Sequence, residues 1–282
     1  MIEVRPNISV VIPHYESVAS VRMAITSVLE QTCLPPELII VDDCSSDRSW
    51  QELKRVVEQY QSAFPKLILL RNKVNSGPAS SRNRGWDEAK HQYVSFLDAD
   101  DMWHPEKLKH VQMVIRAVND VDFISHNAIT GTSATDESRV ESAKYNRIGL
   151  KFFVLRNPVA TPAVTIRRDS DFRFPEGRRY SEDYELWLTM DVSGASMIHM
   201  DGAFVLVDRS RLHEGLSAKR LSMALGELQS LYRALGKSVK YYPIMLIAIF
   251  VSSLKSIARL LGFRPSRLRL IVSGVGNSDG HY

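Results

Sequence analysis

Short apolar runs alternate with segments of helical periodicity through the first hundred residues of the chain. Buried strands are predicted where β-rich apolar runs end at Pro or at polar residues, at 8–12, 38–41, 67–70 and 93–97. Helices are predicted between them at about 18–31, 48–62 and 78–90. Strands that alternate with helices predict right-handed βαβ units and a mostly parallel sheet, so the expected fold class is α/β.

The second half of the sequence is less regular. Further strands are predicted at 163–167 and 198–207, with a helix at 182–191 between them. The segment of about 126–150 is polar and rich in Ser, Thr and charged residues, which predicts a loop or an insertion. From about 222 the pattern is helical.

The composition is that of a folded chain with an uneven charge distribution. Of 282 residues, 44% are hydrophobic and 24% charged, which argues against general disorder. Residues 209–282 hold 12 Lys and Arg against 3 Asp and Glu, whereas residues 1–208 hold 24 against 29. Such a basic tail suits nucleic acid, anionic lipid or only solubility. The two cysteines are expected to be reduced thiols in a cytosolic protein, and no signal peptide is expected at the N-terminus.

Acidic residues follow two of the predicted strands. Asp42 and Asp43 end the second strand, and the run Asp98-Ala99-Asp100-Asp101 ends the fourth. Ligands of parallel sheets bind at the carboxyl ends of the strands. Carboxylates this close repel unless a cation lies between them, and Mg²⁺ or Mn²⁺ takes carboxylate and phosphate oxygens together. The run at 98–101 therefore predicts a metal site, with a turn that caps a helix starting near Pro105 as the alternative.

A turn and a strand end complete this edge of the predicted sheet. Asn75 and Gly77 predict a turn before a helix whose free N–H groups, with Arg82, favour an anionic or polar ligand. The Asp43 carboxylate can accept hydrogen bonds from a nucleotide base or ribose. The adjacent Ser46-Asp47 pair independently predicts a helix N-cap.

Two later segments carry candidate chemistry. Glu182, Asp183 and Glu185 lie in the first turn of a predicted helix, where they either stabilise the helix dipole or supply a general base. The basic loop at 208–217 contains His213, which could close over a diphosphate, although a lone His is usually structural or merely exposed.

Together these segments resemble the family 2 glycosyltransferases, which have a GT-A fold. The resemblance covers about residues 6–217 and looks closest to bacterial enzymes that extend surface polysaccharides, including O-antigen and exopolysaccharide repeat units. Several motifs in the family's order are far more specific than any one of them. The matched positions are 10–13 with Tyr15, 27–32, 40–43 with Ser45 and Asp47, Asn75 with Gly77, Arg82 with Asn83 and Gly85, 98–100, and 182–187.

The resemblance implies a role for each matched position. Asp183 is the expected general base, and Asp100 the expected ligand of Mn²⁺ or Mg²⁺, with Asp98 beside it and nearer the ribose. Glu16 stands where many members have Asn, and His213 matches a loop position that often contacts the diphosphate. The positions expected to hold the donor are Pro13, Tyr15, Glu16, Asp43, Asn75, Gly77, Arg82, Asp98 and His213.

The implied reaction moves a sugar, with inversion, from a nucleotide diphosphate sugar to a hydroxyl of a lipid-linked saccharide. UDP is the commonest donor nucleotide of the family, and GDP and dTDP stay open. Residues 1–220 are the expected catalytic domain, with a nucleotide-binding half at 1–101 and an acceptor half at 102–220. Residues 221–282 are expected to form a basic helical extension.

The extension is the expected contact with a membrane or with protein. Residues 241–254 are 14 uncharged residues, fewer than the roughly 20 needed to span a bilayer. Apolar residues at helical spacing and flanking basic residues predict an interfacial helix on the anionic inner leaflet of the inner membrane, facing the cytoplasm. A helix packed on the domain or on a second subunit is the open alternative.

Two other classes of protein are weighed against this interpretation. A nucleotidyltransferase usually begins with a Gly-rich basic phosphate loop, whereas the first strand here ends in Pro13-His14-Tyr15-Glu16. A non-catalytic nucleotide-sugar-binding subunit is disfavoured because both carboxylate pairs, at 98–100 and 182–183, are retained. Nucleic acid is not an expected partner, because the basic residues are not interleaved with exposed stacking aromatics.

Overall fold

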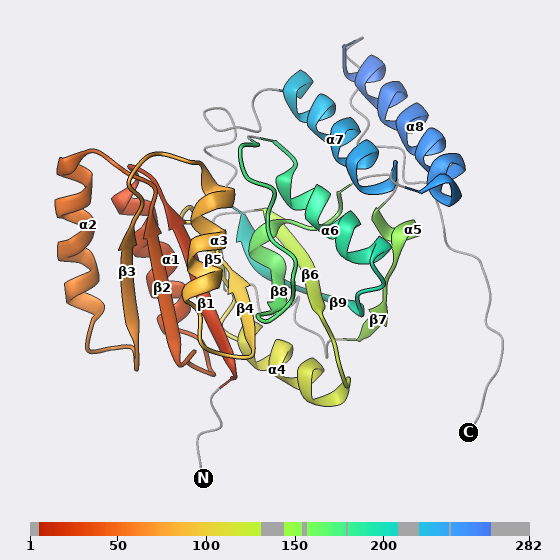
Figure 1. Cartoon of the computed structure of the whole chain (residues 1–282). Helices are drawn as coiled ribbons and strands as arrows, with labels where there is room; N and C mark the ends of the chain where they lie inside the picture. The colour runs from red at the N-terminus through yellow and green to blue at the C-terminus, as the bar shows by residue number, and fades with distance from the viewer. Residues whose placement is uncertain are drawn as a thin grey trace.

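The computed structural model describes residues 6–130, 144–153, 157–178, 180–207, 220–236 and 238–260. The strands of one sheet are β1 (Ile8–His14), β2 (Glu37–Asp42), β3 (Leu67–Arg71), β4 (Tyr93–Phe96), β5 (Asp101–Trp103), β6 (Phe123–Thr130), β7 (Tyr145–Arg147), β8 (Val164–Arg167) and β9 (Met197–Val207). Their order across the sheet is β3-β2-β1-β4-β8-β6-β9-β5, and β7 pairs with β9 (Figure 1).

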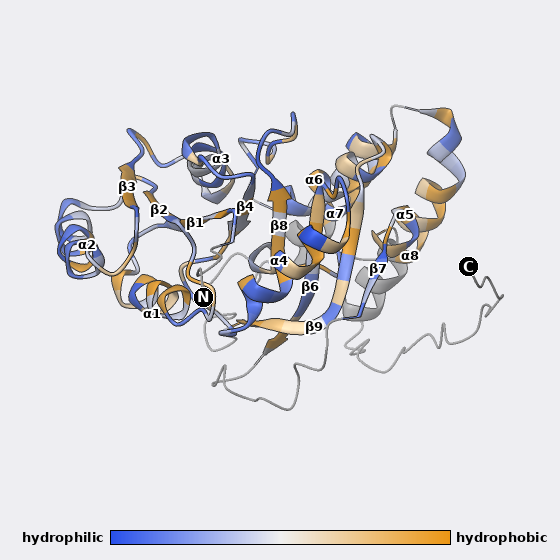
Figure 2. Ribbon diagram, turned by 90° about the horizontal axis from the view of Figure 1, so that it is seen from below, coloured by the Kyte–Doolittle hydropathy of each residue, from blue (hydrophilic) through white to orange (hydrophobic). Residues whose placement is uncertain are grey.

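Helices cover both faces of this sheet. One hydrophobic cluster contains buried residues of α1 (Val18–Leu29), α2 (Asp47–Tyr60) and α4 (Lys107–Ala117). The cluster on the other face contains residues of α3 (Pro78–Glu88), α5 (Leu150–Phe153), α6 (Glu182–Val192), α7 (Arg220–Leu235) and α8 (Tyr242–Leu260). In Figure 2 the sheet strand β8 is coloured hydrophobic, whereas α2 at the sheet edge is largely hydrophilic. Two 3₁₀ helices, η2 (Thr161–Ala163) and η5 (Val239–Tyr241), precede β8 and α8.

The first half of the sheet is parallel, as the sequence predicts. β1 pairs with both β2 and β4, and β2 pairs with β3, all in parallel register. Every residue of β1 and β2 is buried, because helices cover both faces and leave no polar side to the strands. Side-chain alternation divides β1 between the clusters, so that Ile8, Val10 and Ile12 face one and Val11 faces the other.

Helix α3 lies unusually close to the sheet at Gly85. A Cβ atom on Gly85 would lie 2.4 Å from a methyl carbon of Val11 in β1, nearer than any real contact. The close approach explains why a small residue is needed here. It also holds Arg82, one turn earlier in α3, against the end of β4.

The second half of the sheet is mixed. β8 pairs antiparallel with β4 and β6, while β6 and β9 run parallel. The strands predicted at 163–167 and 198–207 and the helix at 182–191 are confirmed by β8, β9 and α6.

The prediction of a loop or an insertion over about 126–150 is wrong in part. Residues 126–130 continue β6, residues 145–147 form β7, and residues 131–143 lie outside the described chain. The polar residues of β6 are satisfied by neighbouring strands: the Asn127 amide donates to the carbonyl of Asp201 at 2.6 Å. Ser125 donates to the carbonyl of Ile198 at 3.3 Å. Whether this segment forms a strand therefore depends on its pairing with neighbouring strands, and such pairing leaves no local pattern in the sequence.

The alternative prediction for the acidic run at 98–101, a turn that caps a helix starting near Pro105, is wrong for Asp101. Asp101 begins the short strand β5 and pairs with Val207 of β9. Its backbone N–H donates to the carbonyl of Asp98 at 3.1 Å, which closes a tight turn around Ala99 and Asp100. The following helix, α4, begins at Lys107 and has Glu106 at its N-cap position.

The two C-terminal helices pack on the helical layer rather than directly on the sheet, α7 against α6 and α8 against α7. Met245 and Ala248 of α8 are buried in the cluster that contains α6 and α7. Leu246, Ile247 and Phe250 on the same helix are exposed, at 62%, 56% and 65%. Within the described residues, no helix combines the length and the apolar character that crossing a membrane requires.

Candidate active site

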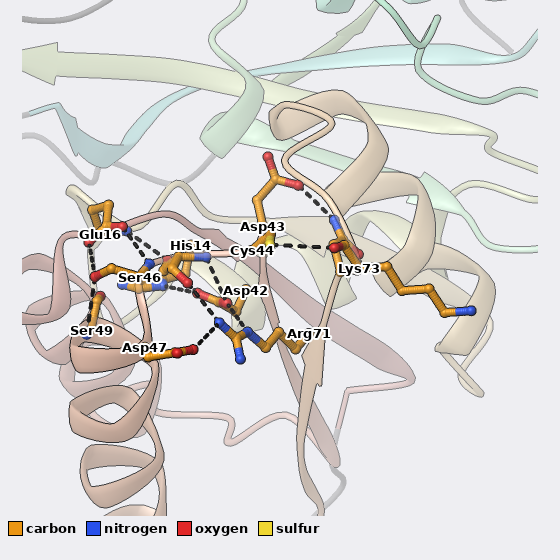
Figure 3. A network of polar contacts seen from close by, with 12 residues as sticks. His14, Glu16, Asp42, Asp43, Cys44, Ser46, Asp47, Ser49, Arg71 and Lys73 are labelled. Atoms are coloured by element: carbon orange, nitrogen blue, oxygen red, sulfur yellow. Dashed lines mark hydrogen bonds and ion pairs between the residues drawn. The ribbon is translucent and has the colours of Figure 1, made fainter.

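The two adjacent aspartates after β2 have different surroundings. Asp42 is fully buried and accepts hydrogen bonds from the Ser45 backbone N–H at 3.1 Å and from the Ser45 hydroxyl at 2.5 Å. His14 Nδ1 lies 3.0 Å from Asp42 Oδ1, the same oxygen that accepts from the Ser45 hydroxyl (Figure 3). Burial raises the pKa of Asp42, but the hydrogen bonds from His14 and Ser45 outweigh burial and hold the pKa below its ordinary value. Asp42 therefore fixes the strand ends.

Asp43 points the other way, toward the turn before α3. Its Oδ1 accepts from the Asn72 amide at 2.7 Å and from the Ser76 N–H at 3.1 Å. Its Oδ2 accepts from the Gly77 N–H at 2.7 Å. Gly77 has φ = +86°, a left-handed value that suits glycine, and it precedes the first residue of α3. The structure thus joins Asp43 to the turn that contains the exposed Asn75.

Glu16 follows β1 in the chain, and its side chain contacts the start of α2 rather than the turn at Asn75 and Gly77. Its carboxylate accepts from the Ser46 N–H at 2.6 Å and from the Ser46 hydroxyl at 2.9 Å. Ser46 is the N-cap of α2, as predicted from the Ser46-Asp47 pair. Figure 3 shows Glu16 directed at Ser46, and Asp43 directed away from both. Of the other candidates at the end of β1, Pro13 is buried and Tyr15 is 54% exposed.

Arg82 joins the acidic turn to the start of α6. Its side chain is 6% exposed and donates to Asp98 at 2.6 Å and to Glu182 at 3.2 Å. The guanidinium carbon also lies 5.4 Å from the centre of the Phe174 ring. Burial lowers the pKa of Arg82, but Asp98 and Glu182 more than compensate and raise it, so the group stays charged. Residues about 100 positions apart thereby form one polar network.

The Asp98-Ala99-Asp100 turn follows β4 at the carboxyl end of the sheet. The Asp98 side chain is 27% exposed, with one oxygen bound by Arg82, and Asp100 is exposed. Among the described residues no group of three or more His, Cys, Asp or Glu is arranged to hold a metal ion. Mg²⁺ is commonly bound by one or two carboxylates together with substrate phosphates and water. The two carboxylates of this turn fit that mode of binding.

Asp183, the predicted general base, lies in the first turn of α6, where both of its carboxylate oxygens accept hydrogen bonds. Its Oδ2 accepts from the Asn157 amide at 3.1 Å and lies 3.4 Å from the Thr161 hydroxyl. Its Oδ1 accepts from the Tyr184 N–H at 2.7 Å. Burial and the neighbouring Glu182 raise the pKa of Asp183 to about 7. A carboxylate with such a pKa exchanges protons efficiently near neutral pH.

The predicted site residues therefore form two groups and several isolated members. Asp43, Asn75 and Gly77 make up one group, and Arg82 links Asp98 to the helix that carries Asp183. His213 lies outside the described residues. The sequence gives no motif for Asn72, Asn157 or Thr161, which contact Asp43 or Asp183 through the fold alone.

Comparisons with known proteins identify the family of the chain. The sequence profile of glycosyl transferase family 2 matches residues 9–173. The amylovoran biosynthesis glycosyltransferase AmsB of Erwinia amylovora is 31% identical over 201 residues, which are 67% of this chain and 65% of AmsB. WfgD of Escherichia coli, a UDP-Glc:α-D-GlcNAc-diphosphoundecaprenol β-1,3-glucosyltransferase, is 30% identical over 196 residues, which are 65% of this chain and 69% of WfgD. The chain spans 38% to 65% of the length of the first curated relatives that it matches.

Solved structures share the fold at low sequence identity. TarS of Staphylococcus aureus in complex with UDP-GlcNAc has a TM-score of 0.66 and 19% identity, over 92% of this chain and 74% of TarS. The mannosyltransferase PcManGT of Pyrobaculum calidifontis, in complex with GDP-Man and Mn²⁺, has a TM-score of 0.62 and 17% identity, over 93% of this chain and 77% of that protein. The predicted GT-A fold is confirmed by these matches. With a family profile that covers more than half of its length, the chain belongs to glycosyl transferase family 2.

Proposed function

We propose that the chain transfers a sugar, with inversion, from a nucleotide diphosphate sugar to a hydroxyl of a lipid-linked saccharide during bacterial surface polysaccharide synthesis. The observation that carries the proposal is the carboxylate of Asp183, with a pKa near 7, joined through Glu182 and Arg82 to the acidic turn. The names of two relatives support it. AmsB is a glycosyltransferase of amylovoran biosynthesis, and WfgD acts on a diphosphoundecaprenol acceptor. A UDP-sugar is the favoured donor, as for WfgD.

The donor nucleotide is assigned to the carboxyl ends of β1, β2 and β4. Asp43 holds the turn at Asn75 and Gly77 through backbone hydrogen bonds, so the turn is rigid before a ligand arrives. The exposed Asn75 and Tyr15 flank this edge and can contact the base and the ribose. Asp98 and Asp100 would hold Mn²⁺ or Mg²⁺, which stabilises the negative charge of a leaving diphosphate when bound.

The acceptor hydroxyl is assigned to Asp183. The ionised carboxylate takes the hydroxyl proton while the oxygen forms a bond to the anomeric carbon, opposite the diphosphate. The bond from that carbon to the diphosphate oxygen breaks, and the nucleotide diphosphate leaves with the electron pair. Glycosyl transfer of this kind passes through an oxocarbenium-like transition state, and a single displacement inverts the anomeric configuration. Asn157 and Thr161 orient the carboxylate.

A panel of nucleotide sugars tests the activity. We expect the chain to release nucleotide from one donor in the presence of a lipid-linked acceptor mixture and Mn²⁺, and to lose this release when the metal is chelated. D100N should lower the rate about a hundredfold, because the leaving group loses charge stabilisation. E52Q, which neutralises an exposed carboxylate on α2, is the matched control and should keep the wild-type rate. Absence of release from every donor would reject the proposed activity.

The exposed face of α8 is assigned to the surface of the inner membrane on its cytoplasmic side. Leu246, Ile247 and Phe250 present apolar side chains, and a basic segment follows them in the sequence, the combination that binds anionic lipid surfaces. Each such side chain contributes roughly 1.5–3 kcal/mol when it leaves water.

Vesicle sedimentation tests this assignment. The variant L246S/I247S/F250S should bind phosphatidylglycerol vesicles at least about tenfold more weakly than the wild type, since several kcal/mol of apolar burial are lost. M113S, which removes an equally exposed apolar side chain from α4, should bind like the wild type. If the triple variant instead changes from dimer to monomer with unaltered vesicle binding, the face serves a second copy of the chain.

A further inference from the structure

A pocket lies between the loop that leads into α6 and the helix α7. Its volume is about 420 Å³, and its lining residues are Gly177, Arg178, Tyr180, Leu225, Gly226, Gln229 and Arg233. Two arginines and no acidic side chain belong to this lining. Arg178 is also paired with Glu185, so among the described residues Arg233 supplies the net positive charge that an anionic ligand requires.

The pocket is fixed relative to the general base. Gly226 of α7 lies so close to the residues before α6 that an added Cβ would be 3.0 Å from Tyr180 Cβ and 3.1 Å from the Tyr180 carbonyl oxygen. The Ser230 hydroxyl of α7 also donates to the carbonyl of Ser181, the N-cap of α6, at 3.0 Å. These contacts tie α7 directly to the turn that carries Asp183.

Both guanidinium groups can reach an oxyanion. Arg178 forms an ion pair with Glu185 of α6 through one terminal nitrogen. Its second terminal nitrogen makes only long contacts of 3.4 Å, to the Gly226 carbonyl and the Gln229 amide oxygen, which a stronger acceptor can replace. Arg233 is exposed and has no ion-pair partner within the described parts of the chain. Arginine forks bind phosphate oxygens in pairs, with charge-assisted hydrogen bonds.

The position of the pocket indicates which anion it binds. Asp183 faces Asn157 and Thr161, whereas Glu185, two positions later in the same turn, faces Arg178 and the pocket. The two sides of a helix are separated by about 10–12 Å, a span that a sugar ring and the phosphates attached to it can cover. Leu225 at the pocket is 59% exposed and offers an apolar contact on the side of α7 and α8.

We propose that the pocket of Arg178 and Arg233 binds the diphosphate group that joins a saccharide acceptor to its lipid. The inference rests on the proposed function, since it assigns the acceptor's phosphates to the far side of the helix whose first turn holds the base. The sugar hydroxyl then reaches Asp183, the diphosphate contacts the two arginines, and the lipid leaves along α7 toward the exposed apolar face of α8.

Direct binding of farnesyl diphosphate tests the pocket without knowledge of the acceptor sugar. The full chain is titrated by calorimetry in saturating UDP and Mn²⁺, which occupy the donor site. R233Q should weaken binding about tenfold, the effect of losing one charge-assisted contact. R116Q, which removes an exposed arginine from α4, should leave binding unchanged. Farnesol and inorganic diphosphate should both bind more weakly than farnesyl diphosphate.

The outcomes separate this proposal from the proposed function. Equal affinity of the wild type and R233Q for farnesyl diphosphate would overturn the pocket assignment, as would an equal loss in R116Q. Inorganic diphosphate that binds as tightly as farnesyl diphosphate would show a site for free anions and reject the lipid-linked ligand. Failure of the wild type to release nucleotide from any donor rejects the proposed function instead, and farnesyl diphosphate binding is measured independently of that result.

Discussion

Replacement of Asp183 by Asn should lower kcat by about 10²–10⁴, the usual contribution of a positioned general base. The amide keeps the size of the carboxylate and can still contact Asn157 and Thr161, but it cannot accept the hydroxyl proton. Donor affinity should stay within about twofold of the wild type, because Asp183 lies outside the group formed by Asp43 and the Asn75 turn. Rapid-quench turnover and equilibrium UDP binding measure the two quantities.

The pH dependence sharpens this prediction. The pKa of Asp183 is raised to about 7, so the wild-type kcat should rise as the pH increases through about 7 and level off above it. The residual activity of D183N should lack this acidic limb. The control D191N makes the same chemical change later in α6 and should keep both the rate and the pH profile. A fully active D183N enzyme would remove Asp183 from the mechanism.

Thermal unfolding separates loss of the base from loss of the fold. The pKa of Asp183 is higher in the folded chain than its ordinary value of 3.8, so ionisation disfavours the folded state. The protonated Asp183 therefore stabilises the folded chain relative to the unfolded chain. This contribution is fully present below about pH 4 and is lost as the pH rises through about 7. Above pH 7, D183N should therefore unfold at a temperature equal to or higher than the wild type, while turning over far more slowly.

Replacement of Arg82 by Met should destabilise the fold by about 3–5 kcal/mol, the cost of leaving buried carboxylates without their cation. Arg82 is the partner of Asp98 and Glu182, whose side chains are 27% and 12% exposed, so the lower end of that range is expected. Transfer activity should fall as well, because Asp98 and the start of α6 lose their common contact. Urea unfolding and nucleotide release measure the two effects.

Two further variants distinguish the charge network from simple packing. R84M removes an exposed arginine from the same helix, whose contacts are with the Arg71 carbonyl and the Asn72 amide oxygen, and should cost no more than about 1.5 kcal/mol. The double variant R82M/E182Q should recover part of the stability lost in R82M, since one unpaired charge is gone. Destabilisation by R82M no larger than that of R84M would contradict the network.

The parallel half of the fold is readable from local sequence because its strands are buried on both faces. Runs such as 8–12 and 38–41 must be continuously apolar, and the turns after them must carry the polar residues that end a strand. The acidic turn at 98–100 and the turn at Asn75 and Gly77 belong to this local pattern. Their sequence positions alone therefore placed them at one edge of the sheet.

Side-chain partners at the candidate site were beyond the reach of the sequence. Arg82 was expected to hold the donor, and the structure places it between Asp98 and Glu182, since α3 packs closely on β1 at Gly85. Glu16 was expected at the donor and contacts Ser46 at the start of α2. Both interactions depend on segments that are distant in the chain, and the fold alone brings them within hydrogen-bonding distance.

By itself the sequence determined the α/β class, the order of the strands and helices in the first half, the family, and the residue types that can bind a nucleotide diphosphate and accept a proton. Tertiary structure decided which polar segments become strands, as at 126–130 and Asp101, because pairing with β9 supplies their hydrogen bonds. It also decided the pKa of Asp183, which depends on burial and on Glu182 in the folded chain. Periodicity is a local property and survives in a single sequence, whereas desolvation and contacts between distant residues exist only after the chain has folded.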